Sequence, residues 1–140
     1  MQIHPLAGQL SVAAQIDVAD IATLAAQGFR SIINNRPDGE VEGQPASALL
    51  EVAARQAGLN YRHIPVVSGQ LSDVQMQEFA DALDTLPRPV LAFCRTGTRS
   101  TMLWALQANG PADTILQIAR EAGYDLSALH SRLSADGRGR

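Results

Sequence analysis

Short apolar runs alternate with longer amphipathic stretches along this chain. The apolar runs are bounded by glycine or proline and have the length of buried strands, whereas the amphipathic stretches repeat apolar residues at helical spacing. The pattern predicts strands at 9–14, 29–35, 59–67 and 89–93. It predicts helices at 18–27, 46–57, 73–86, 112–122 and 126–133, and one more that begins at Ser100. Strands separated by helices favour the α/β class, with a mostly parallel central sheet and helices on both faces.

The caps and apolar faces of the helices complete this outline. Asp17, Ser72 and Asp125 stand where N-caps are expected, and Ser100 or Thr98 is available to cap the helix after the fourth strand. The apolar side of helix 46–57 is predicted to contain Leu49, Leu50, Val52 and Ala53. For helix 73–86 the predicted core side is Val74, Met76, Phe79, Leu83 and Leu86.

The composition is that of one soluble domain. The chain has 140 residues, enough to bury a core, and we expect a single domain at 1–134 with a frayed tail at 135–140. The formal net charge of −3 argues against nucleic-acid binding, and no apolar run approaches the roughly 20 residues of a membrane span. The one cysteine excludes an internal disulfide, which favours a reducing, cytoplasmic location, and the three histidines lack metal-ligand spacing. We therefore expect no metal and no cofactor.

The only cysteine is the centre of the candidate chemistry. Cys94 directly follows the apolar run at 89–93, and a helix is predicted to start a few residues later. The loop would therefore gather the backbone N–H groups of residues 95–100 at the positive end of a helix dipole. Gly97 lets the backbone curl inward, and Arg99 adds a permanent positive charge. These features favour the nucleophilic thiolate over the alternative that Cys94 is a small buried apolar side chain.

Polar residues near Cys94 are the candidate substrate ligands. In the loop they are Arg95, Thr96, Gly97, Thr98 and Ser100. The two threonines could equally be turn residues without such a role. Arg36 joins the set because it follows a strand end, where ligands collect in open α/β sheets, although a solvated loop arginine is an equal alternative. The catalytic residues would be Cys94 and Arg99.

Several segments together carry a family resemblance. They are Gly28-Phe29 with Ile32-Ile33-Asn34, Arg36-Pro37-Asp38 with Glu40, His63-Ile64-Pro65-Val66, and Cys94-Arg95-Thr96-Gly97-Thr98-Arg99-Ser100. In this combination the chain, from about 9 to 106, resembles the phosphatase-like domain of the beta-lactamase-hydrolase-like proteins. The resemblance implies a phosphatase-like three-layer α/β fold, related to that of the dual-specificity phosphatases. It leaves the reaction open, because two cysteine chemistries use this kind of loop.

Two departures from the phosphatase pattern favour sulfur transfer. Only four residues separate Cys94 from Arg99, one fewer than in cysteine phosphatases and as many as in rhodanese sulfurtransferases. Ser68 stands where dual-specificity phosphatases have the aspartate that protonates the leaving group. Asp73 or Asp38 could substitute, but each also fits a helix cap or a turn. Loss of a general acid typically costs about 10²–10⁴-fold in rate, whereas sulfite leaving thiosulfate needs no proton.

The sequence therefore favours a rhodanese-like sulfurtransferase that passes sulfane sulfur through a Cys94 persulfide. The loop amides and Arg99 would hold an anionic donor, thiosulfate or a persulfide, while Arg95 would guide the departing anion. The alternative is a cysteine-dependent phosphatase that acts on a phosphate ester, an aryl phosphate or phosphotyrosine, through a phosphocysteine. A third interpretation is a non-catalytic module that binds an anion or persulfide. A persulfide-oxidising partner enzyme is implied by the resemblance only.

Overall fold

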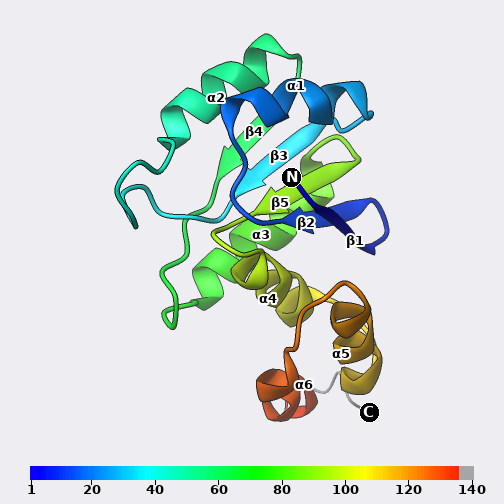
Figure 1. The fold of residues 1–140 in the computed structure, drawn as a ribbon. Coiled ribbons are helices and arrows are strands. Elements are labelled where there is room, and N and C mark those ends of the chain that lie inside the picture. The colour runs from blue at the N-terminus through cyan, green and yellow to red at the C-terminus, as the bar shows by residue number, and fades with distance from the viewer. Residues whose placement is uncertain (136–140) are drawn as a thin grey trace.

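A five-stranded sheet forms the middle layer of the computed structural model, which describes residues 1–135 (Figure 1). The strands are β1 Ile3–Ala7, β2 Leu10–Ala13, β3 Ser31–Asn34, β4 Asn60–His63 and β5 Val90–Phe93. Their spatial order is β1-β2-β5-β3-β4, and all neighbours pair in parallel except β1, which runs antiparallel to β2. The mostly parallel sheet is thereby confirmed. The predicted frayed tail lies outside the described residues, apart from its first position.

The sequence pattern does not predict β1, which forms an edge of the sheet. Pro5 lies inside this strand, and the register shifts between Pro5 and Ala7. An edge strand tolerates proline because one side of it needs no ladder hydrogen bond. Four of its five residues are half-buried, so the strand lacks the alternation of buried and exposed positions by which strands are recognised.

The helices agree closely with the predicted segments. They are α1 Val18–Ala26, α2 Ser47–Gln56, α3 Asp73–Thr85, α4 Thr98–Gln107, α5 Ala112–Glu121 and α6 His130–Ala135. The Oγ of Ser72 caps α3 by accepting a 3.3 Å hydrogen bond from the Gln75 N–H. The predicted helix 126–133 is divided, because a 3₁₀ helix, Ser127–Leu129, precedes α6. The Asp125 carboxylate accepts a 2.9 Å hydrogen bond from the Ser127 N–H at the start of this tighter turn.

Helices cover both faces of the sheet, as predicted (Figure 1). Alternate residues of β5 point into two separate apolar clusters: Val90 and Ala92 join the cluster with α3, α4 and α5, whereas Leu91 and Phe93 join the cluster with α1 and α2. This alternation is the two-residue period of a strand that is buried on both faces. Residues at the carboxyl end of β5 are therefore held from both sides.

Two of the predicted apolar faces are partly wrong. In α2 the buried apolar residues are Leu50 and Ala54, while Leu49 and Val52 are exposed. In α3 they are Phe79 and Ala82, and Val74 is 68% exposed. Each helix meets the core along a narrow stripe with a spacing of three or four residues. Small alanines complete that stripe, whereas the prediction gave weight to bulky residues on its flanks.

Candidate active site

The site lies at the carboxyl ends of three adjacent parallel strands. Cys94 follows β5, Asn35 follows β3 and Ile64 follows β4. The Asn35 N–H donates to the Phe93 carbonyl at 2.8 Å, and the Ile64 N–H donates to the Asn34 carbonyl at 2.8 Å. The segments that follow the three strands therefore leave the sheet side by side. Loops that leave parallel strands at this edge form the ligand crevice of open α/β sheets.

The cysteine loop is shorter than the sequence suggests. Helix α4 begins at Thr98, and its N-cap is Gly97 instead of the predicted Thr98 or Ser100. Gly97 has a φ of +95°, which favours glycine, and a Cβ there would overlap the Tyr124 hydroxyl and lie 3.2 Å from the Ala13 carbonyl oxygen. The first N–H groups of α4 have no carbonyl within the helix to bind, and that of Thr98 donates instead to Thr96 Oγ1 in the loop at 3.4 Å.

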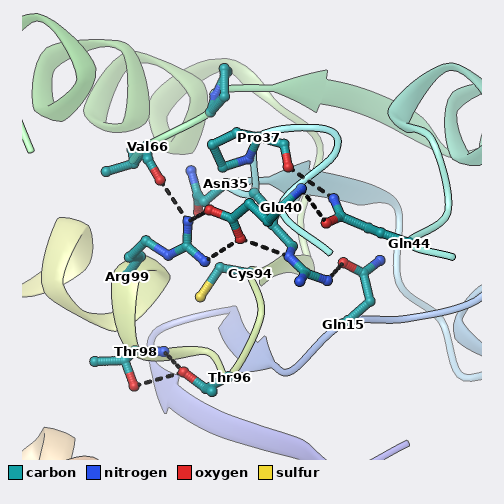
Figure 2. A network of polar contacts seen from close by, with 12 residues as sticks. Gln15, Asn35, Pro37, Glu40, Gln44, Val66, Cys94, Thr96, Thr98 and Arg99 are labelled. Carbon is teal, nitrogen blue, oxygen red and sulfur yellow. Dashed lines mark hydrogen bonds and ion pairs between the residues drawn. The ribbon is translucent and has the colours of Figure 1, made fainter. Parts of the chain in front are cut away.

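One loop amide is aimed at the sulfur. The Gly97 N–H donates to Cys94 Sγ at 3.1 Å, and Cys94 is fully buried. In Figure 2 the sulfur lies between Arg99 and the turn that carries Thr96 and Thr98. Thr96 Oγ1 donates to Thr98 Oγ1 at 3.0 Å, which links the two hydroxyls to each other. The expected arrangement of a thiol at the start of a helix is present.

Glu40 joins the two arginines of the site. Its carboxylate accepts hydrogen bonds from Arg99 at 2.7 Å and 2.9 Å and from Arg36 Nε at 2.8 Å (Figure 2). Arg99 Nη1 also donates to the Val66 carbonyl at 2.7 Å, and Arg36 Nη1 donates to Gln15 Oε1 at 3.0 Å. Both arginines are buried, and they share the Glu40 carboxylate as a countercharge.

These contacts shift the proton equilibria of the site. The hydrogen bond from Arg99 lowers the pKa of Glu40 to about 2, burial opposes the shift, and Arg36 adds to it. The hydrogen bond to Glu40 raises the pKa of Arg99 against the effect of burial, and the electrostatic attraction of Cys94 raises it further. Burial raises the pKa of Tyr124, with a smaller contribution from Cys94. Glu40 is therefore an anion, and Arg99 a cation, throughout the neutral range.

A second polar layer connects the loop to the sheet. Ser100 Oγ donates to Asn35 Oδ1 at 2.8 Å, and Asn35 Nδ2 donates to the Ile64 carbonyl at 3.0 Å. Ser100 and Asn35 are buried. The Ser100 hydroxyl thus holds α4 against β3 and β4, and its predicted contact with substrate stays a prediction.

The structure brings some predicted site residues together and separates others. Cys94, Gly97 and Arg99 form the buried centre of the site. Arg95 and Thr96 are exposed and Thr98 is half-buried, and all three border the adjacent pocket. Arg36 lies against Glu40 and Gln15 instead of on the pocket wall, and its carbonyl is 2.8 Å from His63 Nε2. Substrate binding by these residues stays a prediction.

Neither aspartate considered as a general acid is engaged at the sulfur. Asp38 Oδ1 accepts a 2.8 Å hydrogen bond from the Ser47 N–H at the start of α2. The Asp73 side chain is in the first turn of α3 and is 88% exposed. Both residues thus have the turn and helix-start positions that the sequence offered as the alternative.

A pocket of about 370 Å³ opens beside the loop. Val66, Val67, Leu71 and Met102 give it an apolar wall. The side next to the cysteine loop consists of Arg95, Thr96, Thr98 and Arg99. Arg132 of α6 lines the pocket from the C-terminal segment, residues 122–135. Its volume is in the range of small-molecule sites. Within residues 1–135, no group of three His, Cys, Asp or Glu side chains could hold a metal ion, and no helix is long and apolar enough to cross a membrane.

Glu40, Gln15 and Arg132 are parts of the site that the sequence did not predict. In the sequence, Glu40 is notable only in a segment that carries the family resemblance, and a spacing of four from Arg36 indicates an ion pair on a helix, which this segment does not form. Its pair with Arg99 spans 59 positions and has no local signal. Arg132 lies in a short terminal helix without a motif.

The fold and the site define a phosphatase-like α/β domain with its only cysteine at the start of a helix. Residues 2–111 match the sequence model of the family described as "Beta-lactamase hydrolase-like protein, phosphatase-like domain". The chain belongs to this family, which confirms the resemblance. A beta-lactamase hydrolase-like protein of Xylella fastidiosa is 35% identical over 130 residues, covering 90% of this chain and 30% of the relative. The chain thus spans about 30% of the length of the curated relatives it matches.

Solved structures resemble this fold closely. A candidate phosphatase from Neisseria meningitidis shares 34% identity with a TM-score of 0.87, and the match covers 96% of this chain and 98% of that one. Kinase associated phosphatase, solved with serine in place of its catalytic-site cysteine, has a TM-score of 0.71 at 18% identity and is covered to 93%, with 98% of this chain covered. The comparisons favour the phosphatase alternative over the preferred sulfurtransferase interpretation, and nothing in them supports a persulfide partner.

Proposed function

We propose that this domain is a cysteine-dependent phosphatase that hydrolyses aryl phosphate monoesters through a phosphocysteine. One observation carries the proposal: in a phosphatase-like fold, the Gly97 N–H points at Cys94 Sγ from 3.1 Å, at the N-terminus of α4. A helix N-terminus with free N–H groups favours both a thiolate and a bound phosphate. Arg99, two residues after Gly97, supplies a fixed positive charge beside the thiolate and the phosphate.

The reaction has two steps at one phosphorus atom. The electron pair of the Cys94 thiolate forms an S–P bond while the P–O bond to the aryl group breaks, and the phenolate leaves with that bonding pair. Water then attacks phosphorus, the S–P bond breaks, and inorganic phosphate and the thiolate are released. The proton lost by water goes to phosphate or solvent, and no atom changes its oxidation state. The loop amides and Arg99 stabilise the charge on the phosphoryl oxygens in both steps.

None of the side chains considered as a general acid can protonate a leaving group, which favours aryl over alkyl esters. Ser68 cannot donate a proton as an aspartic acid would, Asp38 is held at the start of α2, and Asp73 is largely exposed. Glu40 is held ionised by two arginines, because its pKa is about 2, so it carries no proton to give at neutral pH. A phenolate leaves without protonation far more readily than an alkoxide does. Missing acid catalysis, worth about 10²–10⁴-fold, therefore restricts the substrates to good leaving groups.

Access to the sulfur gives Glu40 a further role in this proposal. Cys94 is buried, and the Arg99 guanidinium that borders the pocket is already paired with Glu40. A phosphate dianion carries more charge than a carboxylate and offers the same bidentate geometry to arginine. Substrate binding therefore exchanges part of the Arg99–Glu40 contact for an Arg99–phosphate contact.

Two assays with a Cys94→Ser control test the proposal. The wild type should hydrolyse a series of aryl phosphates, with a rate that falls steeply as the pKa of the leaving phenol rises, because no acid assists departure. Cys94→Ser should be folded, by its unfolding midpoint, and inactive. Rapid quenching followed by intact-mass measurement should find a phosphoryl group on Cys94. Faster sulfur transfer from thiosulfate to cyanide, lost in Cys94→Ser, would instead overturn the proposal, as would stoichiometric labelling without turnover.

A further inference from the structure

We propose that the pocket beside the cysteine loop selects aryl phosphates that carry a second anionic group, which binds to Arg132 of α6. This inference rests on the proposed phosphatase function and names the substrate class of the same site. It depends on three features of the pocket, namely its apolar wall, the charge state of its arginines and the attachment of the C-terminal segment.

The apolar wall fits the ring of an aryl ester. Val66, Val67, Leu71 and Met102 form it, and the loop residues that would hold the phosphate form the neighbouring side. A ring placed against this wall, with its phosphate toward Arg99, has its far side directed at the remaining lining residues. Arg132 is one of them. A pocket of about 370 Å³ has room for a substituted phenyl ring.

The arginines of the pocket differ in their availability. Arg99 is buried and bound to both oxygens of Glu40. Among residues 1–135, Arg132 instead has one distant ion-pair partner: its Nη2 lies 3.6 Å from Asp73 Oδ1, and the side chains are 44% and 88% exposed. This separation is longer than a charge-assisted hydrogen bond, and such exposed pairs contribute little. Arg95, which is exposed, makes no ion pair among the described residues. Among the residues that the structure describes, Arg95 and Arg132 carry more charge than Asp73, so this side of the pocket attracts an anion.

The C-terminal segment is anchored firmly enough to position Arg132. Its neighbour Leu133 is fully buried in the apolar cluster of α3, α4 and α5. The Tyr124 hydroxyl, earlier in the same segment, donates a 3.2 Å hydrogen bond to the Thr96 carbonyl of the cysteine loop. Both contacts tie the segment to the site. Because the family match ends at 111, this second anion contact comes from outside the matched region.

Two matched substrates test the inference. They are 4-(carboxymethyl)phenyl phosphate and its methyl ester, whose phenol leaving groups are electronically similar because the methylene group insulates the ring from the carboxylate. We expect the wild type to prefer the acid in kcat/KM, mainly through KM. Arg132→Gln should lower the acid-to-ester ratio by about 3- to 10-fold, because a partly exposed charge contact is lost. Added salt should lower the wild-type ratio in the same direction.

A control variant and a binding measurement separate the outcomes. Arg120→Gln removes another exposed arginine, in α5 and outside the pocket, and should leave the ratio unchanged. Calorimetric Kd values of both substrates for Cys94→Ser, with and without Arg132→Gln, give the same comparison without turnover. An unchanged ratio in Arg132→Gln, or an equal drop in Arg120→Gln, overturns the inference and leaves the phosphatase proposal intact. Failure of the wild type to hydrolyse even the ester overturns the proposed function and the inference with it.

Discussion

Glu40 accepts hydrogen bonds from two buried arginines that come from different parts of the chain. A buried guanidinium without a counterion is strongly unfavourable, so this one carboxylate helps both Arg36 and Arg99 to remain buried. The Glu40 side chain is itself 22% exposed and forms the solvent side of the cluster. At the scale of single residues, one carboxylate offsets only one of the two guanidinium charges, so the cluster keeps a net positive charge that favours an anionic substrate.

Replacing Glu40 by glutamine should destabilise the protein. The amide keeps the shape but removes the countercharge, and breaking a buried pair from one side costs about 3–5 kcal/mol, less here because Glu40 is partly exposed; we expect about 2–4 kcal/mol. Urea unfolding measures the change. Glu51→Gln is the matched control, because its pair with Arg55 is exposed on α2 and should contribute at most about 0.5 kcal/mol. Equal effects of the two substitutions would contradict this assignment.

The same carboxylate should make stability depend on pH in acid. The pKa of Glu40 is about 2 in the folded protein against an ordinary value of 4.5, so between these values the unfolded chain binds a proton that the folded protein does not. The contribution is complete above pH 4.5 and is lost as the pH falls toward 2. The difference in unfolding free energy between wild type and Glu40→Gln should therefore shrink from pH 7 to about pH 3. A difference that stays constant over this range would disprove the linkage.

At the scale of elements, the start of α4 decides the geometry of the cysteine loop. Four residues, 94–97, connect β5 to α4, and the left-handed backbone at Gly97 directs its N–H at the sulfur. Tyr124 packs against the same turn from the segment after α5 and fills the space that a side chain would need. The turn is thus specified by a glycine and by a neighbour that is distant in sequence.

Gly97→Ala should harm both stability and activity. The left-handed conformation costs a non-glycine residue about 1–2 kcal/mol, and overlap with Tyr124 adds to that. Gly58→Ala isolates the first effect, because Gly58 has a φ of +81° with no atom near its would-be Cβ. Thermal unfolding should therefore rank Gly97→Ala below Gly58→Ala, and only Gly97→Ala should lose aryl phosphate hydrolysis. Adding Tyr124→Phe should restore part of the extra stability loss, and no restoration would count against the overlap.

At the scale of the whole molecule, two apolar clusters hold the sheet from opposite sides. The cluster on the α3–α4 side also contains Leu133 and Leu126, so the C-terminal segment that carries Arg132 folds as part of the same core. The site lies at the carboxyl ends of the strands of this sheet. A substitution that disrupts the core on the α3 side should therefore alter the pocket as well as lower the overall stability.

Phe79→Ala tests which face of α3 builds that core. Phe79 is fully buried, so its truncation should lower the free energy of unfolding by about 3–5 kcal/mol. Val74→Ala on the same helix is the control, because an exposed side chain away from special features contributes within about 0.5 kcal/mol. Denaturant unfolding of both variants gives the comparison. A large loss in Val74→Ala would contradict the packing found here.

The sequence alone was sufficient for the order of the strands and helices other than β1, for the fold class, and for placing Cys94 and Arg99 on either side of one strand-to-helix turn. Apolar periodicity, turn residues and a strand–cysteine–glycine–arginine succession are properties of near neighbours, so they can be read along the chain. It did not predict β1, whose edge position and Pro5 hide the strand pattern, or which side of α2 and α3 meets the sheet.

Only the tertiary structure decided what surrounds the sulfur. The Arg99–Glu40 pair joins residues 59 positions apart, Tyr124 reaches the loop from 28 positions away, and Arg132 enters the pocket from the last helix. Such contacts follow from strand order and helix packing, which no local pattern encodes. Loop length, read from the sequence, had favoured sulfur transfer, whereas the fold and its relatives favour phosphate chemistry. The reason is physical: spacing along a loop fixes the number of its amides and can be read along the chain, whereas the charged groups around the loop are brought together only by the folded chain.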